Sequence, residues 1–249
     1  MKLKATLLLS TLAVSASAFA QSKPPEPDYT LSFNAGVVSD YRYRGLSQSR
    51  LKPAFQGGVD YAHKSGFYLG AWGSSIKWIK DSGSTDGSFE LDLYGGYKGE
   101  LTKGLGYDVG VLRYEYVGNK LGAVSGYADA NTTEVYGALT YGVVTAKYSH
   151  SLTNLFGNIN SKGSQYLDLS ATFDLGSGFT LTPHVGRQLM NNNPTYHYTD
   201  YSVTLAKDLG NGLSASLMVV DTNAQVTPYT WGGKYVGKSG AVVGLKYSF

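Results

Sequence analysis

The sequence predicts an all-β fold: a transmembrane, antiparallel, up-and-down β-barrel of about 12 strands, with short periplasmic turns and longer extracellular loops. Three observations support this fold class. Apolar and polar residues alternate with a period of two along most of the chain, long and short connections between the strands alternate, and the chain opens with a pattern typical of exported proteins. Patterns with the period of a helix are nearly absent.

The first 20 residues, MKLKATLLLSTLAVSASAFA, have the pattern of a secretory signal peptide. Two lysines precede an apolar stretch, and Ala18-Phe19-Ala20 supplies the small residues of a cleavage site. Because the apolar stretch is shorter than the roughly 20 residues that a spanning helix needs, a retained membrane anchor is the less favoured alternative. We therefore expect a cleaved signal peptide at 1–20, a short periplasmic segment at 21–28 and the barrel at 29–249.

The composition excludes several classes of protein. The formal net charge is +3, but Lys2 and Lys4 of the expected signal peptide contribute to it, and no basic run interleaves with aromatic residues as in a nucleic-acid interface. The chain has no cysteine, which excludes disulfides and thiolate metal sites. We expect no nucleic-acid partner and no cofactor.

Five strands are predicted in the first half, at residues 30–45, 54–62, 67–75, 88–99 and 105–116. In the first of them, TLSFNAGVVSDYRYRG, the alternation separates two faces. The apolar face carries Leu31, Phe33, Ala35, Val37, Tyr41 and Tyr43, and the polar face carries Asn34, Gly36, Asp40, Arg42 and Arg44. In the fifth, the two faces swap near Val111, which predicts a β-bulge.

Seven strands are predicted in the second half, at residues 133–141, 143–151, 166–175, 180–188, 200–207, 213–221 and 241–249. The strand at 166–175 is regular, with Leu167 and Leu169 opposite Asp168 and Ser170. The strand at 180–188 is weaker, because Pro183 cannot donate a hydrogen bond to the sheet.

The connections between these strands alternate in length without exception, beginning with a long one. Long loops at one end and tight turns at the other are typical of outer-membrane barrels, and an even strand number places both ends of the barrel on the short-turn, periplasmic side. Strands of about 8–11 residues also have the length needed to cross a bilayer when tilted. A soluble β-sandwich would explain the alternation but not the asymmetry of the loops.

The last strand, AVVGLKYSF, alternates up to its final residue. A barrel explains this, because its last strand pairs with its first and leaves no free edge in the hydrocarbon. We expect Tyr247 and Phe249 to lie in the aromatic girdle at the periplasmic interface and to serve as an assembly signal.

The segment from residue 39 to residue 76 resembles the N-terminal hallmark of the TorF-type porin family. The matching elements are Asp40-Tyr41-Arg42 with Arg44-Gly45, Pro53-Ala54 with Gln56-Gly57-Gly58, and the stretch GFYLGAWGS at 66–74. The hallmark covers about 40 residues, and the rest of the chain agrees in length and strand pattern. The resemblance implies an outer-membrane channel.

The polar face of the first predicted strand places Asp40, Arg42 and Arg44 in the lumen, since an arginine facing lipid at the bilayer midplane costs roughly 2–4 kcal/mol. One interpretation is a ladder of arginines that steers anions through the pore. The other, slightly favoured, is that both arginines pair with luminal acids, for which Glu90, Asp92 and Asp168 are the candidates.

The same alternation predicts nine candidate pore-lining residues. These are Asp40, Arg42, Arg44, Glu90, Asp92, Lys98, Lys147, Asp168 and His184.

The sequence favours a channel for the passive diffusion of small polar or ionic solutes, with a weak anion preference. A non-conducting structural or adhesive barrel is the alternative. A lipid-modifying enzyme of the outer membrane is less favoured, because His150 and Ser151 are strand neighbours that point to opposite faces, and no histidine lies in a metal motif. We expect outer-membrane lipids, the barrel-assembly machinery and small polar solutes as partners. The sequence makes no prediction of the oligomeric state.

Overall fold

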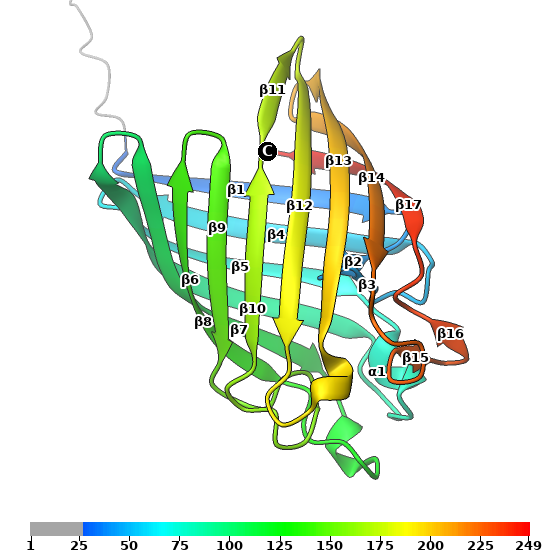
Figure 1. The fold of residues 1–249 in the computed structure, drawn as a ribbon. Coiled ribbons are helices and arrows are strands. Elements are labelled where there is room, and N and C mark those ends of the chain that lie inside the picture. Colours follow the sequence, from blue (N-terminus) through cyan, green and yellow to red (C-terminus); the bar gives the residue numbers. More distant parts are fainter. Residues whose placement is uncertain (1–26) are drawn as a thin grey trace, which may run out of the picture.

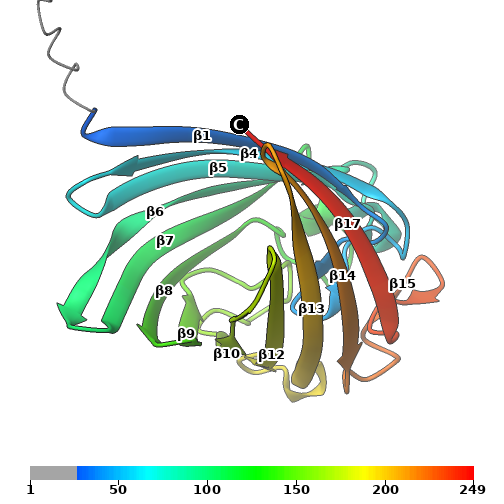
Figure 2. The same ribbon diagram turned by 90° about the horizontal axis from the view of Figure 1, so that it is seen from above.

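The first and last strands of the sheet pair with each other and close it into a barrel (Figures 1 and 2). In the computed structural model, which describes residues 27–249, β1 (Tyr29–Val38) lies between β17 (Gly240–Ser248) and β4 (Ala54–His63). Each strand of the wall therefore has two neighbours, as a span through hydrocarbon requires, except the short segment β11 (Phe173–Gly176), which pairs with β12 (Phe179–Leu189) alone. The expected signal peptide and most of the expected periplasmic segment lie outside the described residues.

The wall of the barrel has the twelve antiparallel strands that the sequence predicts, if β10 and β11 are taken as two parts of one strand. Beyond the three strands above, its members are β5 (Phe67–Ser75), β6 (Phe89–Thr102), β7 (Leu105–Val117), β8 (Thr132–Tyr141), β9 (Val144–Ser151), β10 (Gln165–Ala171), β11 (Phe173–Gly176), β12 (Phe179–Leu189), β13 (Tyr198–Gly210) and β14 (Leu213–Thr222).

The break between β10 and β11 lies opposite the proline that weakens the prediction for β12. The β10–β12 ladder ends at the pair Ser170–His184, and pairing resumes with β11 at Phe173–Leu181. Pro183 falls in the gap and has no N–H to donate across it. On its other side, Pro183 still pairs with Val203 of β13, so the strand itself is continuous.

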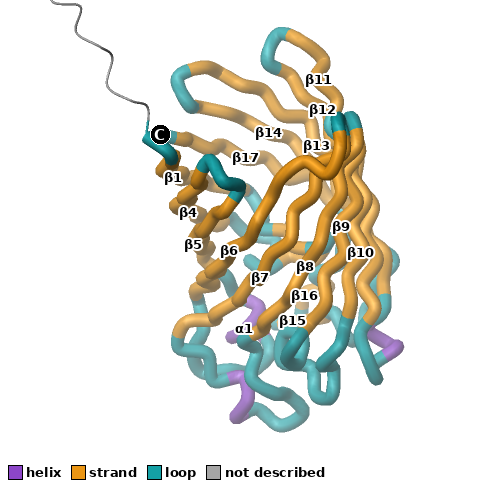
Figure 3. Tube along the Cα trace, turned by 90° about the vertical axis from the view of Figure 1, so that its left-hand side faces the viewer, coloured by secondary structure: helices purple, strands orange, loops and turns teal. Residues whose placement is uncertain are grey.

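The short and long connections lie at opposite ends of the barrel, as predicted (Figures 1 and 3). The short turns are residues 64–66, 103–104, 142–143, 177–178 and 211–212. The long loops hold the remaining elements: β2 (Arg42–Tyr43), β3 (Leu46–Ser47), α1 (Trp78–Asp81), η1 (Leu121–Ala123), η2 (Pro194–Tyr196), β15 (Thr230–Trp231) and β16 (Lys234–Tyr235). None of the helices within residues 27–249 has the length and apolar character needed to cross a membrane.

The prediction of one continuous strand at 30–45 is wrong beyond Val38. The chain bends at Ser39 and Asp40 and forms the separate hairpin β2–β3. Tyr41 and Tyr43, expected on the lipid face, are instead packed inside the long-loop end. The period-two pattern continues past Val38 because β2 is itself extended, so the pattern alone does not reveal the bend.

The predicted bulge at Val111 is also wrong. β7 pairs with β8 without interruption, and the register shift with β6 lies near the short turn, between Glu100 and Thr102. The faces only seem to swap, because inward residues change from small to aromatic toward the long-loop end, where Tyr114 and Tyr116 are buried. Arg113 and Glu115 face outward there and pair at 2.8 Å.

The outer face of the wall is apolar and the inner face is polar, which is the pattern of a membrane barrel. Large apolar side chains exposed on the outside include Leu31, Leu69, Leu93, Val109, Leu139, Leu167, Val203, Leu217 and Val243. Aromatic rings gather on this face at the short-turn end, where Tyr29 stacks on Tyr61 and Tyr97 lies against Tyr107. The largest buried cluster lies at the other end and includes Ile76, Ile79 and Leu121 from the long loops.

Candidate functional site

The hairpin β2–β3 folds into the lumen at the long-loop end and reaches the opposite wall. Arg44 at its tip has a positive φ of 47°, and Gly45 follows with a φ of 78°. A Cβ on Gly45 would lie 2.5 Å from the Cβ of Asp200 on β13. Both the positive φ and the close approach require glycine here. The close approach also shows that the hairpin sits directly against the far wall.

Arg44 connects the hairpin tip to two strands of that wall. Its Nη2 and Nη1 donate to the two carboxylate oxygens of Glu134 on β8, at 2.7 and 3.1 Å, and Nη1 also donates to Gln188 Oε1 at 3.0 Å. The side chains of Arg44 and Glu134 are only 6% and 3% exposed. Such a buried two-point contact fixes both groups strongly in position.

The environment of Arg44 keeps it charged. Burial by itself would lower the pKa of the Arg44 guanidinium, but the Glu134 carboxylate outweighs burial and raises that pKa above its usual value. The guanidinium also lies 4.2 Å from the ring centre of Tyr166 on β10 and 5.0 Å from that of Tyr43. The positive charge of Arg44 is therefore neutralised by Glu134, and the rings of Tyr43 and Tyr166 lie against the guanidinium.

Arg42 and Asp40 form a second pair at the base of the hairpin. Arg42 Nε donates to Asp40 Oδ2 at 2.5 Å, and its Nη1 donates to the carbonyl of Lys238 at 2.8 Å. Ser47 and Ser49 donate to the other oxygen of Asp40, at 2.5 and 3.0 Å. These contacts join the hairpin to the loop before β17. Arg42 and Arg44 are thus paired, but with Asp40 and Glu134, and not with any of the three acids expected from the sequence.

Glu90 and Asp92 lie on the inner face of β6, behind the hairpin. Tyr41 donates to Glu90 Oε1 at 2.8 Å, and burial together with the Glu90 carboxylate raises the pKa of Tyr41 well above its usual value, so the hydroxyl stays protonated. Asp92 Oδ1 is buried without a hydrogen-bond partner in the part of the chain that the structure describes. Both acids are packed into the wall and do not line the cavity below the hairpin.

His184 and Asp168 lie together on the inner face of β12 and β10, below the hairpin. His184 Nε2 is 2.9 Å from Asp168 Oδ2, and its Nδ1 is 3.6 Å from Asp200 Oδ1. Tyr166 donates to Asp200 at 2.9 Å. These groups border a luminal cavity of about 330 Å³, to which Arg42, Arg44 and Lys147 also contribute.

Lys147 and Lys98 lie over tyrosine rings at different depths. Lys147 Nζ is 3.9 Å from the ring centre of Tyr136, within the cavity of His184. Lys98 Nζ is 5.6 Å from the ring centre of Tyr68, close to the short-turn end. The structure therefore groups five of the nine predicted pore-lining residues around one cavity, namely Arg42, Arg44, Lys147, Asp168 and His184.

Two acidic residues of this site were missed by sequence reasoning: Glu134 and Asp200. Glu134 lies on the polar face of its strand, so the alternation could have identified it as luminal. Nothing in the sequence indicates that Arg44 reaches it, because that contact depends on the hairpin folding across the lumen.

Tyr247 and Phe249 lie at the barrel seam, at the short-turn end. Phe249 exchanges backbone hydrogen bonds of 2.8 and 3.0 Å with Phe33 of β1. Its ring stacks on Phe33 and on Tyr247, with centroid separations of 5.8 and 5.4 Å. A role in assembly stays a prediction, but the terminal strand is paired to its last residue.

A closed twelve-stranded barrel with an apolar outer face, a charged lumen and an inward hairpin defines a porin-like fold. The chain belongs to the family described as bacterial protein of unknown function (Gcw_chp), whose profile matches residues 22–249. That description gives no function, so the TorF-type assignment stays a prediction. No protein in the curated set matches the sequence.

Two solved porins share the fold. The KdgM porin matches with a TM-score of 0.55 and 9% identity, over 88% of this chain and 98% of that chain. The NanC porin matches with a TM-score of 0.55 and 12% identity, over 88% of this chain and 99% of that chain. At these identities the likeness concerns the fold alone.

Proposed function

We propose that this protein is an outer-membrane channel of the porin kind, through which small polar or ionic solutes diffuse passively. The observation that carries the proposal is the contrast between the apolar outer face and the hydrophilic interior. Besides the cavity at His184, a second one of about 400 Å³ lies against β1 and β17, bordered by Asn34, Gln56 and Lys246. Hydroxyl, amide and charged groups can replace part of a solute's hydration there while binding it only weakly.

The resemblance to TorF-type porins and the shared fold with KdgM and NanC support this function. The short turns at one end and the long loops at the other support an orientation with the short-turn end in the periplasm and the long loops outside the cell. In this setting, the expected partners are outer-membrane lipids and the machinery that inserts barrels.

The paired arginines favour weak ionic selectivity over a strong anion preference. Arg42 and Arg44 are neutralised by Asp40 and Glu134, so they add little net field to the passage. Lys147 is the better candidate for a weak attraction of anions, because its contact is a tyrosine ring and not a carboxylate.

A non-conducting structural barrel is the second candidate, and the packing of the long-loop end favours it. Tyr41, Trp78 and Tyr114 are all almost fully buried within that end, where a permanently open pore would expose them to water.

Swelling of reconstituted liposomes tests the proposed function. Purified barrel, folded into vesicles that hold an impermeant polymer, should make the vesicles swell in isotonic solutions of small sugars and amino acids, at rates that fall as solute size rises. Swelling no faster than that of protein-free vesicles, for every solute, would contradict diffusion through this barrel and favour the structural candidate.

A further inference from the structure

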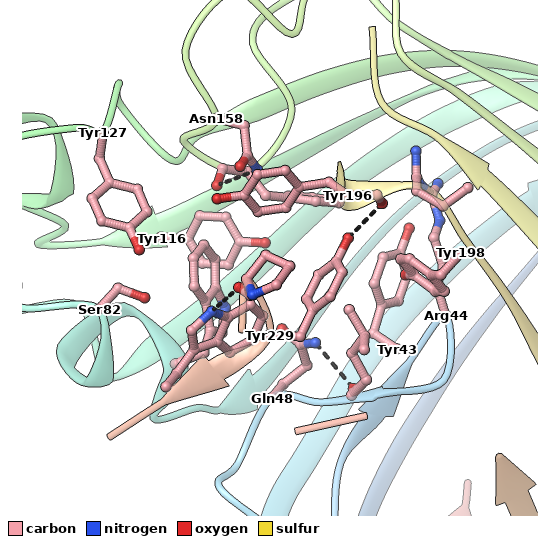
Figure 4. A pocket seen from close by; sticks show the side chains of 16 residues that line it. Tyr43, Arg44, Gln48, Ser82, Tyr116, Tyr127, Asn158, Tyr196, Tyr198 and Tyr229 are labelled. Carbon is pink, nitrogen blue, oxygen red and sulfur yellow. Dashed lines mark hydrogen bonds between the residues drawn. The ribbon is translucent and has the colours of Figure 1, made fainter. Parts of the chain in front are cut away.

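An aromatic pocket opens among the long loops, above the hairpin β2–β3 (Figure 4). Its rings form a connected series: Tyr116 contacts Trp78, Trp78 contacts Trp231, and Trp231 contacts Tyr229, with centroid separations of 5.0, 5.6 and 6.0 Å. Tyr198 continues the series at 5.2 Å from Tyr229. These residues come from four separate loops and strand ends, so the pocket exists only in the folded barrel.

Several polar atoms of this pocket have no partner. Trp78 Nε1 and Ser82 Oγ are buried without a hydrogen bond to any atom of residues 27–249. The hydroxyls of Tyr116 and Tyr198, which also line the pocket, form no hydrogen bond within that range either. Buried polar groups are normally satisfied, so two unsatisfied ones beside two uncommitted hydroxyls around a single pocket indicate a ligand or water that completes them.

Other polar groups of the pocket form hydrogen bonds within the chain. Tyr229 donates to the carbonyl of Tyr196 at 2.7 Å, and Trp231 Nε1 donates to the carbonyl of Pro228 at 3.2 Å. Among the lining residues, the buried groups without a partner are therefore only Trp78 Nε1 and Ser82 Oγ, and the free hydroxyls are those of Tyr116 and Tyr198.

The pocket carries no uncommitted charge. Arg44 lies at its floor, but its guanidinium is held by Glu134, and the Gln188 amide oxygen accepts from Arg44 as well. An anionic ligand would have to compete with Glu134 for that cation. The remaining lining consists of aromatic faces with hydroxyl, indole and amide groups, which match a ligand that has an apolar face and hydrogen-bonding groups around its edge.

We propose that this pocket binds a single neutral sugar ring, whose C–H face lies on the aromatic residues and whose hydroxyls satisfy Trp78, Ser82, Tyr116 and Tyr198. The cavity measures about 50 Å³, so the ring enters as the half-buried rim side chains of Tyr127 and Tyr196 swing outward on their loops, while Trp231 stays stacked on Trp78. The pocket lies at the outer mouth of the proposed channel and would be the first site that an incoming solute meets.

A neutral sugar would be a solute class for the proposed channel. The role of the site in uptake rests on that proposed function, but sugar binding itself does not. Binding is measured without conduction, so the two proposals fail separately: a protein that binds sugar but does not conduct would retain this site and lose the channel.

Saturation-transfer NMR on the folded barrel in detergent tests the site, with glucose, glucuronate and indole as probes. We expect saturable glucose binding that is tighter than glucuronate binding. Tyr116→Phe and Tyr198→Phe each remove one hydroxyl and keep the ring, and each should weaken glucose binding about fivefold. Tyr141→Phe, on the outer surface at the short-turn end, is the matched control and should leave binding unchanged.

Heat-modifiable migration on gels confirms that each variant is folded before it is compared. Absence of saturable glucose binding to the unmodified protein would overturn the proposal. So would tighter binding of glucuronate, which would indicate recognition of charge, or binding of indole alone, which would indicate a purely apolar pocket. Unchanged glucose binding in both folded tyrosine variants would place any sugar site elsewhere.

Discussion

The two ends of the barrel are built on the same strands but have different interiors. At the long-loop end, the hairpin β2–β3 crosses the lumen, Arg44 is held by Glu134, and Tyr114 and Tyr116 are buried. Toward the short-turn end, the inner wall carries residues such as Gly36, Ser214 and Lys246 around open cavities. The same strands form the wall in both halves, so the wall does not cause the difference.

The wall and the constriction have separate physical origins. The wall follows from alternation and closure, which satisfy the backbone in hydrocarbon. The constriction follows from one long connection that folds inward and is held by a buried ion pair. Changes in that connection should therefore alter stability and passage far more than equivalent changes near the short turns.

The largest expected effect is that of Glu134→Gln. It leaves the Arg44 guanidinium buried without its carboxylate, and breaking a buried pair costs about 3–5 kcal/mol. The free energy of unfolding, measured by urea titration of the barrel in lipid vesicles, should fall by that amount.

Asp108→Asn is the matched variant in the more open half. Asp108 accepts a hydrogen bond of 2.6 Å from Tyr68 and forms no ion pair among the described residues, so we expect a loss of about 1 kcal/mol. Equal losses for the two variants would mean that the two ends do not differ as described.

The next largest effect is expected for Gly45→Ala. A Cβ at this position meets Asp200 at 2.5 Å and also needs a positive φ, so the variant should lose about 2–3 kcal/mol and push the hairpin away from the wall. Gly142→Ala, in a short turn with a φ of 58° and open space around it, isolates the backbone cost of about 1 kcal/mol. If urea titration gave the same loss for both, the hairpin would not press on Asp200.

The wall and the hairpin differ in how well their structure could be predicted from the sequence. The strand number and the alternation of loops were predictable, because closure and a two-sided wall impose a period of two on residues such as Leu167 and Asp168. The hairpin was not, because Arg42 and Tyr43 continue the same alternation after the chain has left the wall. Luminal facing was inferred for Arg44 from a strand that ends before it.

The partners of the site were less predictable than its members. A charge on a polar face identifies the lumen, but which acid an arginine meets depends on how far a loop reaches across it. The pair of Arg44 and Glu134 is separated by 90 residues in sequence. The aromatic pocket was missed for the same reason, since Trp78, Tyr116 and Tyr229 come from different loops.

A smaller effect is expected at the seam. Phe249→Ala removes the ring that stacks on Phe33 and Tyr247 but keeps the backbone hydrogen bonds, so stability should fall by about 1–2 kcal/mol and the yield of inserted barrel should drop. Phe173→Ala, also exposed at the short-turn end but away from the seam, is the control. Equal yields of heat-modifiable protein in membranes would exclude a special role for Phe249 in assembly.

The smallest effect is expected for Lys147→Ala. The Lys147 ammonium faces the cavity without a carboxylate within ion-pair distance among residues 27–249, so its removal should shift the permeability ratio toward cations by about twofold. Reversal potentials in a salt gradient measure this shift, which should shrink at high salt as the charge is screened. Lys103→Ala, in a short turn outside the lumen, should have no effect; a shift as large as that of Lys147→Ala would indicate a general surface-charge effect.

Single-channel conductance in planar bilayers tests the central claim most directly, namely that an inward hairpin constricts an otherwise open, hydrophilic lumen. The unmodified barrel should show small conductance steps, and a variant in which residues 42–47 are replaced by a short glycine-serine linker should show steps that are severalfold larger. The strands of the wall are untouched by this replacement, and heat-modifiable migration verifies the fold. Identical steps in the two proteins, or none in either, would contradict the claim.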